Sequence, residues 1–253
     1  MLAVIGQKTI LMLGRIGRIT LFLAQAVKSS FSPPVYFREF IRQFLSIGFY
    51  SLPIVSLTAI FSGMVLALQT YIGFNRFSAT EALATVVVLS ITRELGPVLT
   101  GLMVAGRVGA SMAAEVATMN VTDQIDAMRT LETDPFRYIV APRFLATLIS
   151  MPLLVLVADI IGIFGGYLLS VHYLDFNSAQ YIQQTHKYLE AADVIFGLIK
   201  AAAFGTAVSI ISCYCGMSSQ RGAIGVGIAT TRAVVWSSIL IFILNYLLTA
   251  ILF

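Results

Sequence analysis

Residues 142–171 read PRFLATLISMPLLVLVADIIGIFGGYLLSV, a run of 30 residues in which only Arg143 and Asp159 are charged. About 20 apolar residues in α-helical form are enough to cross the hydrocarbon core of a bilayer. Pro152 and the pair Gly165–Gly166 interrupt the run, but helices inside membranes tolerate such residues when neighbouring helices cover them. The stretch therefore predicts a transmembrane helix and indicates the fold class of the chain.

The rest of the chain has the same apolar character. Of its 253 residues, 58% are hydrophobic and 11% are charged, whereas about a quarter of the residues of a soluble domain are charged. Such a composition excludes a soluble globular protein, and it is far too apolar for a disordered chain. Two cysteines are too few for a disulfide scaffold. We expect an all-α polytopic membrane protein.

Four further apolar stretches have the length of a membrane span, at 47–74, 81–104, 194–215 and 226–253. The first of them would be re-entrant if Pro53 broke its helix. Two polar segments, 106–138 and 172–193, are too polar to cross. We therefore expect about five transmembrane helices in a domain at 47–253.

The N-terminal region 1–46 mixes basic and apolar residues in a way that suits helices lying in the membrane interface. Amphipathic stretches at 1–30 and 35–45 are separated by the turn sequence SSFSPP at 29–34. We treat 1–46 as an interfacial region that precedes the transmembrane domain.

Basic residues concentrate on one side of this arrangement. With five spans, 12 of the 16 lysines and arginines fall in 1–46, 106–143 and 218–232. Short loops rich in lysine and arginine stay in the cytoplasm. The pattern predicts a cytoplasmic N-terminus, a cytoplasmic segment 106–138, and a segment 172–193 and a C-terminus on the opposite side.

No catalytic or nucleotide-binding motif is visible in the chain. It lacks a P-loop, a zinc-protease HExxH and a GxSxG nucleophile turn. His172 and His186 are better explained as solvated side chains than as metal ligands, and no basic, aromatic-rich run suggests nucleic acid. We expect neither an enzyme nor a metal site.

Arg93 and Glu94 stand inside the second predicted span, directly before Gly96 and Pro97. Ionisable groups within a span are costly and usually face protein or a wet cavity. One interpretation is a pair that neutralises itself at the boundary of the membrane. The other is a polar lining for a substrate route, in which the arginine meets an anionic headgroup.

Asp159 is a single carboxylate among apolar residues of the third span. It is either a hydrogen-bonded or protonated structural residue, or a proton carrier of a secondary transporter. These two interpretations stay open.

The polar segment 106–138 contains a predicted short helix, TDQIDAMRTL, ended by Pro135. Asn120 or Thr122 is the expected N-cap. An apolar stripe follows at helical spacing: Val121, Ile125, Met128 and Leu131. A stripe of this kind packs either on the spans of its own chain or into a partner subunit.

Residues 92–128, TRELGPVLTGLMVAGRVGASMAAEVATMNVTDQIDAM, closely resemble the signature of the MlaE family, and the match continues through DPFRYIVAPR at 134–143. The MlaE family comprises permease subunits of ABC transporters that work with MCE-domain proteins. The resemblance implies a permease in the bacterial inner membrane, with a periplasmic C-terminus, that moves phospholipids between inner and outer membranes and so preserves outer-membrane asymmetry.

The same resemblance implies several partners. They are a second copy of the chain, two copies of a cytoplasmic ATPase, a periplasmic hexamer of an MCE-domain protein and a small STAS-domain protein. ATP and Mg²⁺ would bind to the ATPase, so no cofactor is expected in this chain.

The resemblance also implies two sets of site residues. The substrate-binding candidates are Leu66, Gln69, Tyr71, Arg93, Glu94 and Pro97. The candidates for coupling to the ATPase lie on a cytoplasmic coupling helix and just before it: Glu115, Thr122, Asp123, Gln124, Ile125, Asp126 and Met128.

Two other functions are weighed against this one. An ion-coupled secondary transporter would use Asp159 or Glu94 as its proton carrier, although the inverted repeats common in that class are not visible. An intramembrane enzyme acting on lipids would need a nucleophile with a base beside it, and the sequence shows no such pair.

Overall fold

The computed structural model describes residues 2–33, 36–75 and 82–252, and of residues 1–12, 15 and 16 it describes no side chains. The described residues form helices and no strand. Residues 76–80 of the predicted turn between the first two spans lie outside this description. The all-α class expected from the sequence is confirmed.

Five candidate membrane spans are present in the described residues, so the expected number is confirmed. They are Phe37–Asn75, Leu83–Val121, Phe136–His172, Ala191–Met217 and Ala223–Leu252. The chain is a multi-pass membrane protein.

Several helical elements make up the first three spans. The first span joins α2 (Phe37–Ile47), the short η1 (Phe49–Ser51) and α3 (Leu52–Asn75). The second joins α4 (Leu83–Ser90), η3 (Ile91–Leu95), α5 (Gly96–Val104), η4 (Ala105–Gly109) and α6 (Ala110–Val121). The third joins η5 (Phe136–Val140) and α8 (Ala141–His172). The remaining two spans are the single helices α10 (Ala191–Met217) and α11 (Ala223–Leu252). Outside the spans lie α1 (Leu2–Ser30), α7 (Gln124–Thr130) and α9 (Ser178–Tyr188).

The first and second spans differ from their predicted bounds: the first candidate span begins at Phe37, not near 47, because α2 continues into α3. Pro53 does not break the first span, because it stands in the first turn of α3, where its missing N–H costs no helical hydrogen bond. The second span does not end near residue 104 but continues to Val121. Small residues and the π-helical turn η4 carry it past the predicted limit.

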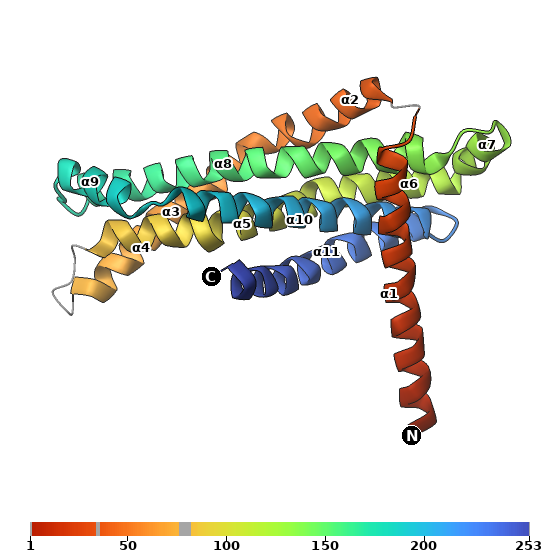
Figure 1. Cartoon of the computed structure of the whole chain (residues 1–253), viewed down its shortest axis with the longest axis horizontal. Coiled ribbons are helices and arrows are strands. Elements are labelled where there is room, and N and C mark those ends of the chain that lie inside the picture. The colour runs from red at the N-terminus through yellow and green to blue at the C-terminus, as the bar shows by residue number, and fades with distance from the viewer. Residues whose placement is uncertain (1, 34–35, 76–81, 253) are drawn as a thin grey trace.

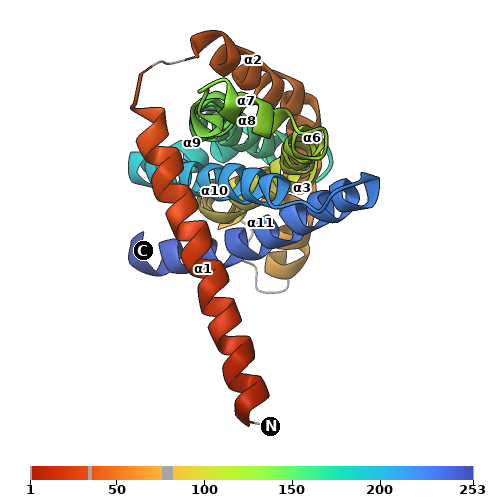
Figure 2. The ribbon, with the colours of Figure 1, turned by 90° about the vertical axis from the view of Figure 1, so that its right-hand side faces the viewer.

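The spans form an elongated bundle with α7 at one end and α9 at the other, which we call the α7 end and the α9 end (Figure 1). α8 and α10 pack on each other; α3 lies against α8, and α11 lies against α10. α1 crosses the bundle steeply near the α7 end (Figures 1 and 2). This is the arrangement of a helix that lies in the membrane plane beside helices that cross it.

α1 is attached to the bundle through its second half. Phe22 and Ala26 are buried in a cluster with Phe144. The Phe22 ring lies 4.9 Å from the ring of Phe136 and 5.6 Å from that of Tyr214. The aromatic contacts hold the interfacial helix against α8, α10 and η5.

At the opposite end, α9 is anchored by Tyr181. Its ring packs 5.6 Å from the ring of Tyr167, and burial raises the pKa of the Tyr181 phenol to about 12. The side chain is therefore neutral at physiological pH and holds the polar helix α9 on the ends of the spans.

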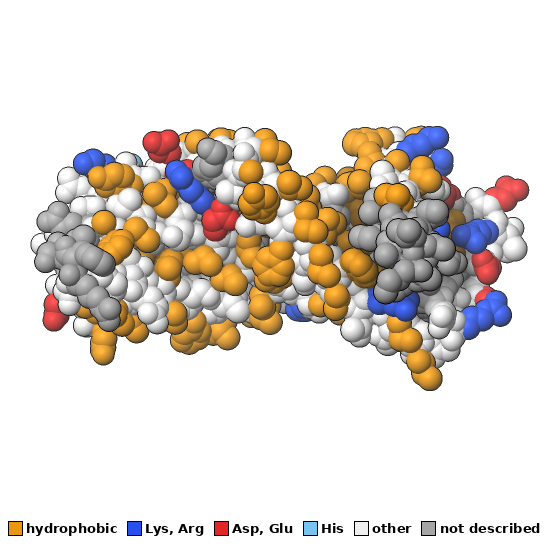
Figure 3. Space-filling view, turned by 90° about the horizontal axis from the view of Figure 1, so that it is seen from below, with side chains coloured by type: hydrophobic (Ala, Val, Ile, Leu, Met, Phe, Trp, Pro, Cys, Tyr) orange, Lys and Arg blue, Asp and Glu red, His pale blue; other side chains and the backbone are white. Residues whose placement is uncertain are grey.

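The surface has the pattern of a membrane protein. Figure 3 shows hydrophobic side chains spread along the middle of one face, while most charged side chains gather toward its ends; a close positive and negative pair lies between them. Large exposed side chains such as Leu57, Phe61 and Val65 line α3. They are suited to contact with lipid or with another membrane subunit.

The close packing of α3 on α8 depends on glycine. A Cβ on Gly63 would overlap the carbonyl oxygen of Gly162, and one on Gly165 would overlap the carbonyl oxygen of Ile60. Helices in membranes approach this closely only where small residues face each other.

We expect Gly63→Ala to destabilise the protein, because its methyl group meets the backbone of α8. Overpacking typically costs about 1–3 kcal/mol. Gly73→Ala, on the same helix with nothing within 4 Å of the added atom, is the matched control. Thermal unfolding in detergent measures both variants, and equal stability of the two would contradict a glycine-dependent contact.

Candidate functional site

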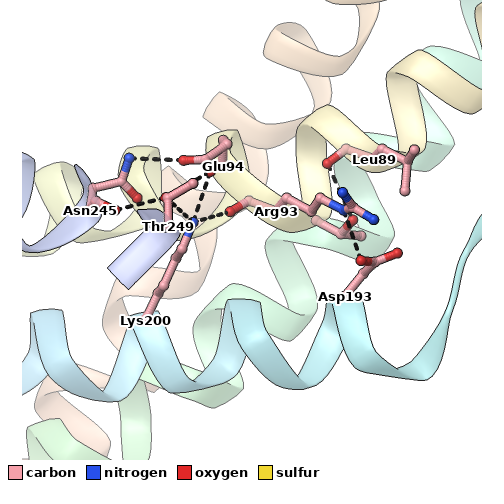
Figure 4. A network of polar contacts seen from close by, with 8 residues as sticks. Leu89, Arg93, Glu94, Asp193, Lys200, Asn245 and Thr249 are labelled. Atoms are coloured by element: carbon pink, nitrogen blue, oxygen red, sulfur yellow. Dashed lines mark hydrogen bonds and ion pairs between the residues drawn. The ribbon is translucent and has the colours of Figure 1, made fainter. Parts of the chain in front are cut away.

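A polar cluster lies in the half of the bundle toward the α9 end, where η3 meets α10 and α11 (Figure 4). It contains the two predicted residues Arg93 and Glu94. Four more residues complete it: Asp193 and Lys200 of α10 and Asn245 and Thr249 of α11.

The local backbone explains why Lys200 is there. Pro97 has no N–H, so it cannot donate to the carbonyl of Arg93 as a residue four positions later in a helix normally does. Lys200 Nζ donates to that carbonyl oxygen at 2.8 Å. The π turn of η3 and the proline together open a backbone acceptor that a side chain from another helix satisfies.

Glu94 is the centre of the cluster. Its Oε1 accepts from Lys200 Nζ at 2.9 Å and from Thr249 Oγ1 at 3.0 Å, and its Oε2 accepts from Asn245 Nδ2 at 2.8 Å. The Lys200 side chain is 0% exposed, whereas that of Glu94 is 39% exposed. The carboxylate therefore compensates a fully buried ammonium and still reaches the surface.

Arg93 is paired separately. Its Nε lies 2.8 Å from Oδ1 of Asp193, a buried carboxylate in the first turn of α10. The side chain of Arg93 keeps 37% of its surface exposed. Two cations and two carboxylates thus balance, and the cation of Arg93 is presented at the outside of a neutral cluster.

The interpretation of Arg93 and Glu94 as a pair that neutralises itself is wrong in detail. Each is neutralised by a residue of α10, Arg93 by Asp193 and Glu94 by Lys200. Sequence reasoning missed all four partners. Lys200 inside an apolar span, and the i, i+4 pair Asn245 and Thr249 on one face of α11, were the available signals.

The other predicted substrate residues lie apart from this cluster, except Pro97, which stands in the first turn of α5 directly after η3. Leu66 and Tyr71 pack against buried residues of α4 and η3, including Ile91, and the Tyr71 ring lies 6.0 Å from that of Phe176. Gln69 is exposed. Pro97 is buried beside Gly197 of α10.

Asp159 is buried and lies against Gly96, so closely that a Cβ there would overlap Oδ1. Within the described part of the chain, neither carboxylate oxygen has a hydrogen-bond partner. A groove between α3, α5 and α8 runs past its neighbours Ala158 and Gly162. A lone buried carboxylate is costly unless it is protonated. The structure places Asp159 beside Gly96, directly after the π turn η3, with no hydrogen-bond partner among the described residues.

The short helix α7 stands at the opposite end of the bundle. Two non-glycine residues in left-handed conformation bracket it, Asp123 with φ 56° and Glu132 with φ 58°. The predicted N-cap is wrong: Asp123 occupies that position, Thr122 ends the preceding helix, and neither caps α7 through its side chain. The left-handed turn reverses the chain so sharply that the usual capping geometry is lost.

The apolar stripe of the α7 region is buried in part and exposed in part. Ile125 is buried against Val116 and Ile139, with Met128 packed beside them. Leu131 is 77% exposed. The remaining coupling candidates of this region are exposed on its surface: Thr122, Asp123, Gln124 and Asp126.

Side-chain contacts tie this end of the chain together. Asn120 Nδ2 donates to the carbonyl and hydroxyl oxygens of Ser219 at 3.2 Å, and Arg221 lies 3.3 Å from Asp123. Glu115 Oε2 accepts from Nη2 of the buried Arg143 at 2.9 Å. α7 is thus joined to the loop that begins α11, the helix that also carries Asn245 and Thr249.

The structure contains no cluster of three or more potential metal ligands among the residues it describes.

The pairing of Glu94 and Lys200 predicts an asymmetry in stability. Glu94→Gln removes the carboxylate beside a fully buried ammonium, whereas Lys200→Met leaves a carboxylate that water partly solvates. Breaking a buried pair costs about 3–5 kcal/mol, and we expect Glu94→Gln to cost more than Lys200→Met. The free energy of unfolding in mixed micelles measures this, and the double variant should recover part of the loss. Additive losses would contradict direct pairing.

Comparison with known proteins identifies the family. Residues 40–251 match the family model described as Permease MlaE. A probable ABC transporter permease protein of Rickettsia conorii is 61% identical over 98% of this chain and 96% of its own length.

More distant relatives cover the chain as well. The intermembrane phospholipid transport system permease protein MlaE of Haemophilus influenzae is 36% identical over 100% of this chain and 97% of its own length. The chloroplastic protein TRIGALACTOSYLDIACYLGLYCEROL 1 of Arabidopsis thaliana is 34% identical over 93% of this chain and 67% of its own length. With its five spans and the family match over most of its length, this chain belongs to the MlaE permease family.

Proposed function

We propose that the chain is the membrane-spanning subunit of an ABC transporter that moves phospholipids between the inner and outer membranes and thereby maintains outer-membrane asymmetry. The observation that carries the proposal is the similarity, over the whole chain, to a permease named for intermembrane phospholipid transport. The half-exposed cation of Arg93 and the exposed helix α7, at opposite ends, are features that such a subunit needs.

The membrane in question is the bacterial inner membrane. Basic residues of 1–46, 106–143 and 218–232 lie on the α7 side of the spans, which supports a cytoplasmic α7 end with the N-terminus on the same side. The α9 end and the C-terminus are then periplasmic. Arg93 falls in the periplasmic half of the membrane.

The substrate site in this proposal is the surface around Arg93. A guanidinium recognises phosphate oxygens, and Asp193 orients it from behind. We propose that apolar and aromatic side chains of α3, including Leu66 and Tyr71, contact the acyl chains; Gln69 and Pro97 complete the candidate set.

The energy comes from another subunit, because this chain contains no Walker motif. We propose that two ATPase copies bind at α7 and that ATP and Mg²⁺ bind to them alone. A second copy of this chain, a periplasmic MCE-domain hexamer and a STAS-domain protein complete the proposed assembly. Closure of the ATPases would press on α7 and narrow the space around Arg93.

Asp159 favours one alternative function, an ion-coupled transporter, because it is buried and carries no partner among the described residues. Purified chain reconstituted alone in liposomes distinguishes the two. Lipid movement driven by a proton gradient without any ATPase would support the alternative and overturn the proposal.

Arg93→Ala is expected to lower ATP-dependent phospholipid transfer roughly tenfold or more, because a charge-assisted hydrogen bond is worth about 1.5–3 kcal/mol. The assay follows labelled phospholipid moving between vesicles with the complete transporter. Lys187→Ala, which removes an exposed cation at the same end, should leave transfer unchanged. Full transfer by Arg93→Ala would remove Arg93 from the substrate site.

Asp126→Lys is expected to weaken binding of the ATPase subunit, because it reverses an exposed charge on α7. Co-purification from detergent gives the ratio of the two subunits. Asp175→Lys, an exposed reversal at the α9 end, is the control. If both variants retain the ATPase equally, and Gln124→Lys does so too, α7 is not the docking element.

A further inference from the structure

A second polar site lies at the α7 end, in a groove between α2 and the η4–α6 part of the second span. Gln43 and Ser46 line it from α2, and Arg107, Ser111 and Glu115 line it from the other side. The rest of the lining is apolar. None of the roles proposed above uses Arg107; of the groove lining, only Glu115 is also a candidate for coupling to the ATPase.

Arg107 is the distinctive member. Its Nη1 donates to Ser51 Oγ at 2.7 Å, and it forms no ion pair with any residue that the structure describes. The arginines Arg93 and Arg143, by contrast, each have a carboxylate within 2.9 Å. Arg107 is exposed and stands in the π turn η4, as Arg93 stands in η3. Such turns occur frequently at functional sites.

The charges around the groove leave a net cation. Glu115 is the carboxylate of the lining, and it is paired with the buried Arg143 at 2.9 Å. Arg107, Arg143 and Glu115 together therefore carry one positive charge. Gln43 and Ser46 add an amide and a hydroxyl that can donate hydrogen bonds, whereas the Ser111 hydroxyl donates to Glu115 Oε1 at 3.4 Å. A cation with several neutral donors around it suits an anion rich in oxygen atoms, such as a phosphate.

The level of the groove in the membrane identifies the source of that phosphate. Arg107 follows Arg93 by 14 positions, or about 21 Å along a helix, which puts it in the opposite half of a bilayer about 30 Å thick. α1 crosses the bundle near this end (Figures 1 and 2) and marks the interface. The groove therefore opens where headgroups of the α7-side leaflet lie.

We propose that this groove binds the phosphate of a phospholipid in the leaflet at the α7 end, with Arg107 as its cationic ligand. The inference rests on the proposed function for the side of the membrane, but binding itself needs no ATP. A bound phosphate would join Arg107 of the second span to Gln43 and Ser46 of α2, and so hold α2 against α6. It is a site separate from that of Arg93.

The test measures phospholipid bound to the complete purified transporter without nucleotide, by native mass spectrometry during titration with dioctanoyl phosphatidylglycerol. Arg107→Gln should lower the affinity of one site per chain roughly tenfold, the effect of one charge-assisted hydrogen bond. Arg42→Gln is the control, because it removes an exposed cation at the same end, on α2 but outside the groove lining. Arg107→Lys should retain part of the affinity.

Two further arms keep the result interpretable. If Arg107→Gln fails to fold, Ser111→Leu fills the groove with Arg107 intact and should lower binding likewise. Inorganic phosphate is titrated in competition: displacement at millimolar concentration would show a soluble phosphate site and overturn the lipid assignment.

Equal losses in Arg107→Gln and Arg42→Gln would show a diffuse surface-charge effect, and no loss in either would show that the groove binds no lipid. Both results overturn the proposal. ATP-driven transfer is measured separately, so failure of this site and failure of the transport function are distinguishable.

Discussion

The buried ammonium of Lys200 is the constraint on which the half of the bundle toward the α9 end depends. A charge enclosed by protein inside a membrane is costly unless it is paired and hydrogen-bonded. Here the partners come from two other elements, the carbonyl of Arg93 and the carboxylate of Glu94 on η3 and the hydroxyl of Thr249 on α11. Three spans are therefore held together at one point by polar contacts, in a medium where apolar packing alone distinguishes poorly between protein and lipid.

The same point explains the irregular backbone of the second span. A regular helix would leave the acceptor of Arg93 blocked by its own chain, but Pro97 and the π turn expose it. A second π turn carries Arg107. Both arginines of this span thus stand where the helix departs from regular geometry, and each keeps part of its side chain exposed.

The two ends of the molecule are mechanically connected through α11. At its start, the loop of Ser219 and Arg221 contacts Asn120 and Asp123 beside α7. Near its end, Asn245 and Thr249 bind Glu94. α11 and the loop before it therefore contact both the proposed ATPase-docking region and the polar cluster. Ile125, buried on its own chain, anchors α7 to the bundle.

The sequence determines the number of spans, the all-α class and the presence of charges inside the spans at Arg93, Glu94 and Asp159. The free-energy cost of placing backbone and charges in lipid is local and can be summed along the chain. Which charge pairs with which does not follow, because Asp193, Lys200, Asn245 and Thr249 lie about 100 to 155 positions away from Arg93 and Glu94. Only the packing of α10 and α11 on η3 brings them within hydrogen-bond distance. Likewise, periodicity predicted an apolar stripe on α7, but only the position of Val116 and Ile139 decided that Ile125 is buried while Leu131 is exposed.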